Sequence, residues 1–347
     1  MEMQNNLPVD HLGKKQNKMG LFVLSILGLL IFVSFMISMN TGFIRLSPAD
    51  LVHTLLGKGT AQQELILFDF RLPRIVISVL IGAGLAVSGC VMQAISRNAL
   101  ADPGILGINS GAGLMVMLFI FLYPSASAVP VLLLPVLALA GGTLTAAVVF
   151  ALSYSRHKGI MPTRLLLTGV AIAAAISSAM IVLTLRLSPE KYQFVATWLA
   201  GSIWGTSWKF VLSLLPWIVV LLPYVFYKGR VLNVLNLGEG TATGLGTFVS
   251  REQLKTLAAA VGLAASCVSV SGGIGFVGLI GPHLARRLVG PKHQWLLPAS
   301  ALAGALLVLT ADTIGRWILQ PTEVPTGIVV AVIGAPYFLY LLVKTKN

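Results

Sequence analysis

The sequence predicts an all-α protein that crosses a membrane about ten times. Of its 347 residues, 56% are hydrophobic and only 10% are charged, against roughly 25% charged residues in soluble domains. One soluble core could not bury so much apolar surface. Apolar runs of about 20 residues recur along the chain, which is the length of a helix that spans a bilayer. The runs are continuously apolar rather than alternating, so each is predicted to be a helix.

Ten segments carry these apolar runs. In order they are residues 20–40, 74–96, 104–123, 129–154, 163–187, 209–228, 254–271, 275–289, 296–319 and 326–343. The eighth is short and rich in glycine and proline. The first is longer than the apolar core of a secretory signal peptide and has no clear cleavage site, so it is predicted to be a span. The 35 glycines of the chain suit close packing of membrane helices.

Lysine and arginine residues orient the spans. If the N-terminus lies inside, most of the 24 basic residues fall in inside segments, as they do in the cytoplasmic loops of membrane proteins. Ten spans then place both termini in the cytoplasm. The net charge of +13 follows from this topology and needs no nucleic-acid partner. The predicted organisation is a cytoplasmic tail at 1–19, a single membrane domain at 20–343 and a cytoplasmic end at 344–347.

Three connections are too long to be simple turns. Residues 41–73 and 188–208 are predicted outside, and the second of them can form a short interfacial helix because its three tryptophans favour the membrane boundary. The inside connection, within 229–253, contains LGEGTATGLG. This stretch can form a short helix that Gly244 and Gly246 end, and a groove on a partner protein could hold such a helix. A solvated loop explains the same residues.

The sequence has none of the common catalytic patterns. It lacks HExxH, GxSxG and the phosphate-binding loop GxxxxGK[ST], and no paired carboxylates lie within the spans. No catalytic residue and no metal site are predicted, and the chain is expected not to be an enzyme. Cys90 and Cys267 lie in apolar runs without partners at metal-ligand spacing, and we interpret them as packing residues.

Charged residues are almost absent from the central parts of the spans, whereas an ion-coupled transporter usually keeps them there. Asp312 and Arg316 lie toward the outer end of the ninth span. They are four residues apart, so they share a helix face and can pair. The pair either serves the function or only stabilises the helix end. Two function classes remain: the membrane subunit of a pump energised by a partner ATPase, and a passive channel.

Seven stretches carry a resemblance to one family. They are RLPRIV (71–76), SGCVMQAISRNALADPGILGINSGA (88–112), TRLLLTGVA (163–171), LNLGEGTATGLG (235–246), GGIGFVGLIGPHLARRLVG (272–290), ADTIGR (311–316) and EVPTGIVVAVIGAPYF (323–338). Over about residues 20–343 the chain resembles the membrane permeases of bacterial ABC importers for ferric siderophores, haem and cobalamin, the FecCD-type family. The resemblance implies the type II importer architecture, with ten spans per subunit and alternating access between two subunits.

The resemblance also implies a cargo and a set of partners. The cargo would be a ferric siderophore, with cobalamin or haem as alternatives within the family. The partners would be a second permease subunit, identical or related, two cytoplasmic ATPases that bind ATP and magnesium, an extracytoplasmic siderophore-binding protein, and membrane lipid. The chain itself would bind no cofactor. It would lie in the bacterial cytoplasmic membrane.

The family pairs exposed arginines of the permease with glutamates of the binding protein. The matching positions here are Arg71 and Arg74 in RLPR and Arg316 in ADTIGR. The predicted topology places all three outside. An arginine–carboxylate pair can be bidentate, which fixes orientation, and Pro73 suits the first turn of a helix. The other interpretation is that these arginines reach lipid headgroups.

Two inner sites are implied in the same way. The coupling residues, which would sit in a cleft on the ATPase, are Leu237, Gly238, Glu239, Ala242, Gly244 and Gly246. The cytoplasmic gate matches Met161, Pro162 and Thr163. The span that follows, 163–187, would line the path. Its many Ala, Ser and Thr residues suit plain helix packing as well.

Overall fold

The computed structural model describes residues 9–41, 50, 53–54, 56–123, 131–155 and 159–344. Within this part of the chain, each of the ten predicted spans is a helix. They are α1 (Val9–Asn40), α4 (Leu72–Ser96), α5 (Ile108–Leu122), α6 (Leu133–Ser153), α7 (Pro162–Thr184), α9 (Trp208–Tyr227), α12 (Val249–Ser271), α13 (Val277–Val289), α14 (His293–Ile318) and α15 (Thr326–Lys344). The predicted all-α membrane fold is confirmed.

The ten helices differ in length. Seven helices in the described residues are long and apolar enough to cross a membrane, and α5 and α15 are shorter apolar helices. α13 has 13 residues, about 20 Å at a rise of about 1.5 Å per residue, against about 30 Å of hydrocarbon. It follows a non-helical segment, 272–276. The predicted eighth span is therefore a short helix that a non-helical segment precedes.

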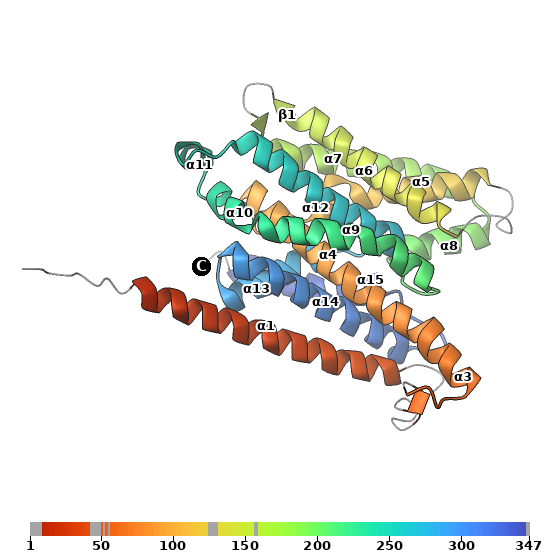
Figure 1. Ribbon diagram of the computed structural model, residues 1–347. Coiled ribbons are helices and arrows are strands. Elements are labelled where there is room, and N and C mark those ends of the chain that lie inside the picture. The colour runs from red at the N-terminus through yellow and green to blue at the C-terminus, as the bar shows by residue number, and fades with distance from the viewer. Residues whose placement is uncertain are drawn as a thin grey trace, which may run out of the picture.

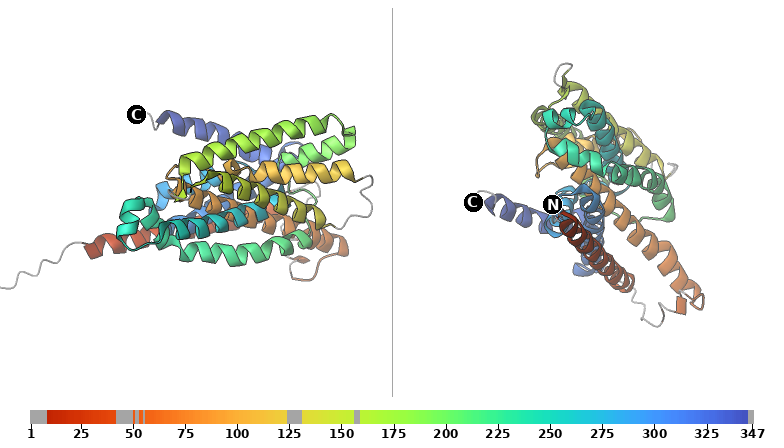
Figure 2. Two further views of the ribbon diagram at one scale, coloured as in Figure 1. Left: turned by 90° about the horizontal axis from the view of Figure 1, so that it is seen from above. Right: turned by 60° about the vertical axis from the view of Figure 1, so that its left-hand side comes forward.

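The helices run side by side in a bundle with two distinct ends (Figure 1). One end carries α10 (Gly229–Asn236) and α11 (Glu239–Gly244), and we call it the α11 end. The opposite end carries α3 (Ala61–Glu64) and α8 (Pro189–Leu199), and we call it the α8 end. α1 begins and α15 finishes at the α11 end (Figures 1 and 2). An even number of crossings fits these positions.

Helix α4 forms the centre of the bundle and packs against α14, α12, α13 and α9. Gly82 of α4 and Gly304 of α14 meet so closely that a Cβ on either residue would overlap the carbonyl oxygen of the other. Small residues let membrane helices approach backbone to backbone in this way. Cys90 and Cys267 are buried in the same core with free thiols, which agrees with their interpretation as packing residues.

Residues 41–73 are predicted to be an outside connection, and this prediction is wrong for the second half of the segment. A helix begins at Ala61 and continues to Ser96. Thr60 caps its first turn, because the threonine side chain accepts a hydrogen bond from the backbone N–H of Gln63. This first turn is polar, so a search for apolar runs passes over it.

Directly before α4 the helix widens into a π-helical turn, η1 (Leu65–Arg71). Such turns commonly occur as short irregularities within α-helices. Pro73 follows η1, and the chain is helical on both sides of it. Arg71 and Arg74 therefore lie inside one long helix instead of at the start of a span.

The other two long connections contain the short helices that the sequence predicts. α8 begins after Ser188, whose hydroxyl accepts from the backbone N–H of Lys191. α11 ends at Gly244, and Gly246 follows with a φ of +79°. The eight-residue helix α10, which the sequence analysis does not separate, precedes α11 in the second connection.

The predicted N-terminal tail, 1–19, is helical from Val9 onward, so α1 extends well beyond its apolar part. Lysine and leucine favour helices, which explains the extension. Residues 1–8 and 345–347 lie outside the described residues. So do the basic loop residues on which the topology partly rests, Arg45, Arg156 and Lys158.

Candidate functional site

The three arginines predicted to dock a partner lie together at the α8 end, with Asp312 and Glu323 beside them. We call Arg71, Arg74, Asp312, Arg316 and Glu323 the arginine cluster. Its members come from η1, α4, α14 and the connection between α14 and α15. Segments that are far apart in the sequence thus meet at one place.

Arg74 contacts both acids of the arginine cluster. Its Nε and Nη2 atoms donate to Oδ1 of Asp312 at 3.0 and 2.8 Å. Its Nη1 atom donates to Oε2 of Glu323 at 2.7 Å. Oδ2 of Asp312 lies 3.1 Å from Nε of Arg316, so the predicted pairing of these two residues is confirmed. One buried carboxylate therefore lies between two guanidinium groups.

Arg71 and Arg316 bind the C-terminal end of α1. Nη1 of Arg71 donates to the carbonyl oxygen of Met39. Nη1 of Arg316 donates to the carbonyl oxygens of Ser38 and Thr41 at 3.3 and 3.0 Å. The last carbonyls of a helix have no partner within it, and the helix dipole makes that end negative. The two arginines therefore cap α1 and tie it to η1 and α14.

The predicted exposure of the three arginines is wrong. Arg71 and Arg316 are each 6% exposed, and the side chain of Arg74 is 11% exposed. The reason is that Asp312, Glu323 and the end of α1 provide their partners within the chain. Docking of a binding protein on these residues stays a prediction.

At the α11 end, most of the predicted coupling residues are exposed. Leu237 is 62% exposed, and Glu239, Gly244 and Gly246 are exposed as well. Ala242 requires a correction, because it is fully buried and its side chain cannot reach a partner. Its small size lets α11 lie against the rest of the chain.

Gly238 is half-buried and has a φ of +110°, which few residues besides glycine adopt. It starts α11. Sequence reasoning missed Leu245 and Phe248, which are 63% and 74% exposed. With Leu237 they place three large apolar side chains on the exposed surface around α11. The sequence did carry a signal for them, because these large apolar residues stand in a stretch that otherwise consists of small and polar residues.

The predicted gate also lies at the α11 end. The strands β1 (Tyr154–Ser155) and β2 (Gly159–Ile160) pair antiparallel just before it. Met161 directly precedes α7, and Pro162 is its first residue. Met161 is 36% exposed, and Thr163 is exposed. α7 itself buries little of its surface within the described residues, so a second subunit or lipid can cover it.

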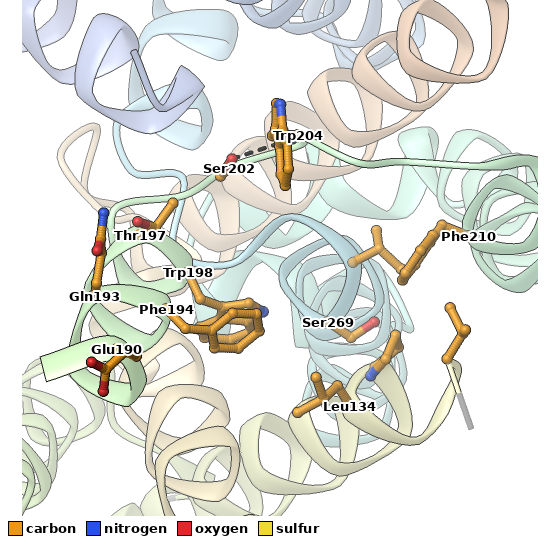
Figure 3. A pocket seen from close by; sticks show the side chains of 13 residues that line it. Leu134, Glu190, Gln193, Phe194, Thr197, Trp198, Ser202, Trp204, Phe210 and Ser269 are labelled. Atoms are coloured by element: carbon orange, nitrogen blue, oxygen red, sulfur yellow. Dashed lines mark hydrogen bonds between the residues drawn. The ribbon is translucent and has the colours of Figure 1, made fainter. Parts of the chain in front are cut away.

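A pocket of about 640 Å³ opens at the α8 end, between α6, α8, α9 and α12 (Figure 3). Phe194, Trp198 and Phe210 contribute aromatic walls, and among the described residues Glu190 is the only charged one that lines it. None of the lining residues belongs to α7 or to the arginine cluster. The described part of the chain holds no group of three His, Cys, Asp or Glu residues close enough to share a metal ion. The pocket suits an apolar guest.

The chain matches the FecCD transport family over residues 29–344. Over 336 residues it is 47% identical to the iron(3+)-hydroxamate import system permease protein FhuG of Bacillus subtilis (strain 168), which covers 96% of this chain and 99% of that protein. Over 287 residues it is 39% identical to the hemin transport system permease protein HmuU of Yersinia pestis, which covers 80% and 83% of the two chains.

A solved structure has the same fold. It is a metal-chelate type ABC transporter in an inward-facing conformation, and it superposes with a TM-score of 0.82 at 33% sequence identity. The superposition covers 93% of this chain and 99% of that one. The predicted permease architecture is therefore found in a known transporter.

Proposed function

The chain belongs to the FecCD transport family, and from this membership we propose that it is the transmembrane permease subunit of an ATP-binding-cassette importer for a ferric siderophore. It is a multi-pass membrane protein, and its membrane would be the bacterial cytoplasmic one. The observation that carries the proposal is the 47% identity, over nearly the whole of both chains, to a permease named for iron(3+)-hydroxamate import. A hydroxamate siderophore is therefore the first cargo to test.

In this proposal the α11 end faces the cytoplasm and the α8 end faces outward. Lysine and arginine gather on the cytoplasmic side of membrane proteins. Arg97 ends α4, Arg230 lies in α10 and Arg251 lies in the first turn of α12, all near the α11 end. α1 also begins there, and α15 finishes there (Figure 1). Both termini would thus be cytoplasmic.

Two ATPase subunits would bind the surface around α11 and supply the energy. Leu237, Leu245 and Phe248 are large apolar side chains that are exposed there, and burial of such side chains against a partner is favourable. The ATPases would hold ATP and magnesium, and this chain would bind no cofactor. The chain would have no catalytic residue of its own and would not be an enzyme.

A second permease subunit, identical or related, would cover the exposed surface of α7. The cargo would pass between the two subunits, with Met161, Pro162 and Thr163 at the cytoplasmic gate. Closure of the ATPases on ATP would move α11 and change which side of the path is open. The membrane domain, predicted at 20–343, would act as one unit in this step.

An extracytoplasmic siderophore-binding protein would deliver the cargo to the α8 end. Arg74 is the best-supported contact of the three predicted arginines, because Glu323, one of its two carboxylate partners, has a side chain that is 31% exposed. Arg71 and Arg316 would contribute by holding α1 in place beside it. A partner that carries a carboxylate can form a charge-assisted pair at this position.

Uptake of radiolabelled iron tests the proposed cargo. Cells that lack this chain would be complemented with it and given ferric hydroxamate, catecholate or citrate complexes. We expect restored uptake of a hydroxamate complex, and loss of that uptake when the partner ATPase is inactivated. Failure to restore any of the three would overturn the siderophore assignment. Uptake that persists without ATPase activity would indicate a passive channel.

Haem is the second candidate cargo, because the chain is 39% identical to a hemin transport system permease. The same complemented cells would be supplied with haemin as their iron source, and with cobalamin in a separate assay. Growth on haemin without uptake of any ferric siderophore would assign the chain to haem import. The permease role would stand in that case and only the cargo would change.

A further inference from the structure

Glu323 is placed to compete with a docking partner for Arg74. It lies in the connection between α14 and α15, and its Oε2 atom accepts from Nη1 of Arg74 at 2.7 Å. Its side chain is 31% exposed, whereas Asp312, the other acid on Arg74, is fully buried. Glu323 is therefore the outer of two carboxylates on one guanidinium group, and a partner approaching the α8 end meets it first.

The backbone around Glu323 is held by contacts that do not involve its carboxylate. The backbone N–H of Val324 donates to the carbonyl oxygen of Gly315 at 3.1 Å. The hydroxyl of Thr326 donates to Oδ1 of Asp312 at 3.2 Å. These bonds anchor the connection to α14 on the C-terminal side of Glu323. The glutamate side chain can therefore leave Arg74 while the connection stays in place.

Arg74 also keeps a counter-ion when Glu323 leaves. Its bonds to Glu323 and to Asp312 use different nitrogen atoms: Nη1 for the first, and Nε and Nη2 for the second. Loss of Glu323 alone does not leave an unpaired buried charge, which would be costly. Nη1 then becomes available to pair with a carboxylate from outside.

We propose that docking of the binding protein is an exchange of carboxylates on Arg74. A glutamate or aspartate of the partner takes Nη1, and Glu323 turns to solvent. The inference rests on the proposed docking at the α8 end, and it gives Glu323 a regulatory part in that contact. The ion pair between Glu323 and Arg74 breaks when the pair between the partner and Arg74 forms. Glu323 therefore lowers the affinity of the permease for the binding protein and speeds release of the emptied binding protein.

Substitution of Glu323 by glutamine tests the exchange. Glutamine keeps the size of the side chain but forms a weaker, uncharged bond to Arg74. Removal of a partly exposed competing ion pair should raise the affinity of the importer for its binding protein by up to about 5-fold. The dissociation constant would be measured in nanodiscs, with the complete importer and a binding protein loaded with ferric hydroxamate.

Three control variants accompany Glu323→Gln. Glu64→Gln removes an exposed carboxylate at the same end of the bundle, so it changes the net charge equally without touching Arg74. Glu323→Gln in an Arg74→Lys background should lose most of the gain, because lysine lacks the forked donors. Glu323→Asp, whose shorter side chain draws back from Nη1, should give an intermediate affinity. It also serves if Glu323→Gln fails to fold.

The outcomes separate the exchange from the proposed function. Stronger binding by Glu323→Gln that depends on Arg74 would support the exchange. Unchanged or weaker binding in a wild-type importer that docks its partner normally would overturn the exchange alone. An equal gain from Glu64→Gln would reduce the effect to net charge and would also overturn it. A wild-type importer that binds no such protein would overturn the docking proposal itself.

Discussion

Arg74 and Asp312 are joined by two hydrogen bonds although 238 positions separate them in the sequence. They belong to α4 and α14, whose backbones meet at Gly82 and Gly304 deeper in the bundle. Asp312 also accepts from the hydroxyl of Thr326, the first residue of α15. One buried carboxylate thus joins α4, α14 and α15 at the α8 end.

Asp312→Asn should destabilise the protein strongly. The substitution removes the negative charge between Arg74 and Arg316, and leaves two buried guanidinium groups with Glu323 as their remaining acid in the arginine cluster. Removal of one partner from a buried ion pair typically costs about 3–5 kcal/mol. The apparent melting temperature of the purified protein in detergent would measure this. Asp69→Asn changes an exposed acid in η1 and should have little effect. Equal melting temperatures for the two variants would contradict the prediction.

Most of the fold could be predicted because the bilayer dictates it. A segment that crosses hydrocarbon must be apolar, helical and about 20 residues long, so each apolar run identified a helix. The start of the second long helix at Ala61 escaped this reasoning, since its first turn is polar and only Thr60 and Gln63 signal it. The short length of α13 did not escape it, because the eighth predicted span, 275–289, is itself short.

The site could be predicted only where its residues are close in the sequence. Asp312 and Arg316 are four residues apart on one helix, and their pairing follows from helical geometry. The contacts of Arg74 with Glu323, and of Arg71 with Met39, join distant segments and depend on tertiary packing. This is also why the arginines are buried where exposed side chains were expected.

Gly304→Ala should destabilise the bundle by about 1–3 kcal/mol. A Cβ at this position would overlap the carbonyl oxygen of Gly82, so α4 and α14 must separate. Gly28→Ala in α1 is the matched control, because no atom of the residues that the structure describes lies within 4 Å of a Cβ there. Alanine favours a helix by up to about 1 kcal/mol over glycine, so the control should be neutral or stabilised. Thermal unfolding that ranks Gly304→Ala at or above Gly28→Ala would refute the close contact.

Phe248→Ala should weaken the association with the partner ATPase. The phenyl ring is 74% exposed at the α11 end, and burial of such a side chain in an interface contributes about 1.5–3 kcal/mol. Copurification of the ATPase with tagged permease would show the loss, at least about tenfold in affinity. Leu56→Ala removes another exposed apolar side chain, 67% exposed and outside the α11 region. Retention of the ATPase by both variants would remove Phe248 from the proposed interface.

Asp102 makes the stability of the chain depend on pH. It lies in the connection between α4 and the short helix η2 (Pro103–Leu106), where its Oδ1 atom accepts from the backbone N–H of Gly104 at 2.7 Å. Burial raises its pKa from an ordinary value of 3.8 to about 6, although the bond from Gly104 opposes the rise. A void of about 10 Å³ beside it is lined by apolar residues and Asn109, and no second charged group of the described residues lines it.

The folded state holds the proton of Asp102 more tightly than the unfolded state does, and this decides the direction in which pH changes the stability. Between about pH 4 and pH 6 the folded protein keeps this proton and the unfolded chain releases it, so stability decreases as the pH rises through this range. The loss is about 3 kcal/mol at most, since one pKa unit corresponds to about 1.4 kcal/mol. Asp102→Asn keeps an oxygen that can accept from Gly104 but cannot ionise. The melting temperature of Asp102→Asn minus that of wild type should therefore be larger at pH 7 than at pH 4.5.

Melting curves at several pH values would test this prediction on the purified protein in detergent. Glu64→Gln is the control, because it removes an exposed carboxylate of α3, and the difference between its melting temperature and that of wild type should stay nearly constant over this pH range. If the curves of Asp102→Asn and wild type ran parallel from pH 4.5 to pH 7, ionisation of Asp102 would not be opposed by burial. The connection between α4 and η2 would then have to open to water around this carboxylate, and the close packing of Asp102 against Gly278 of α13 would not hold in solution.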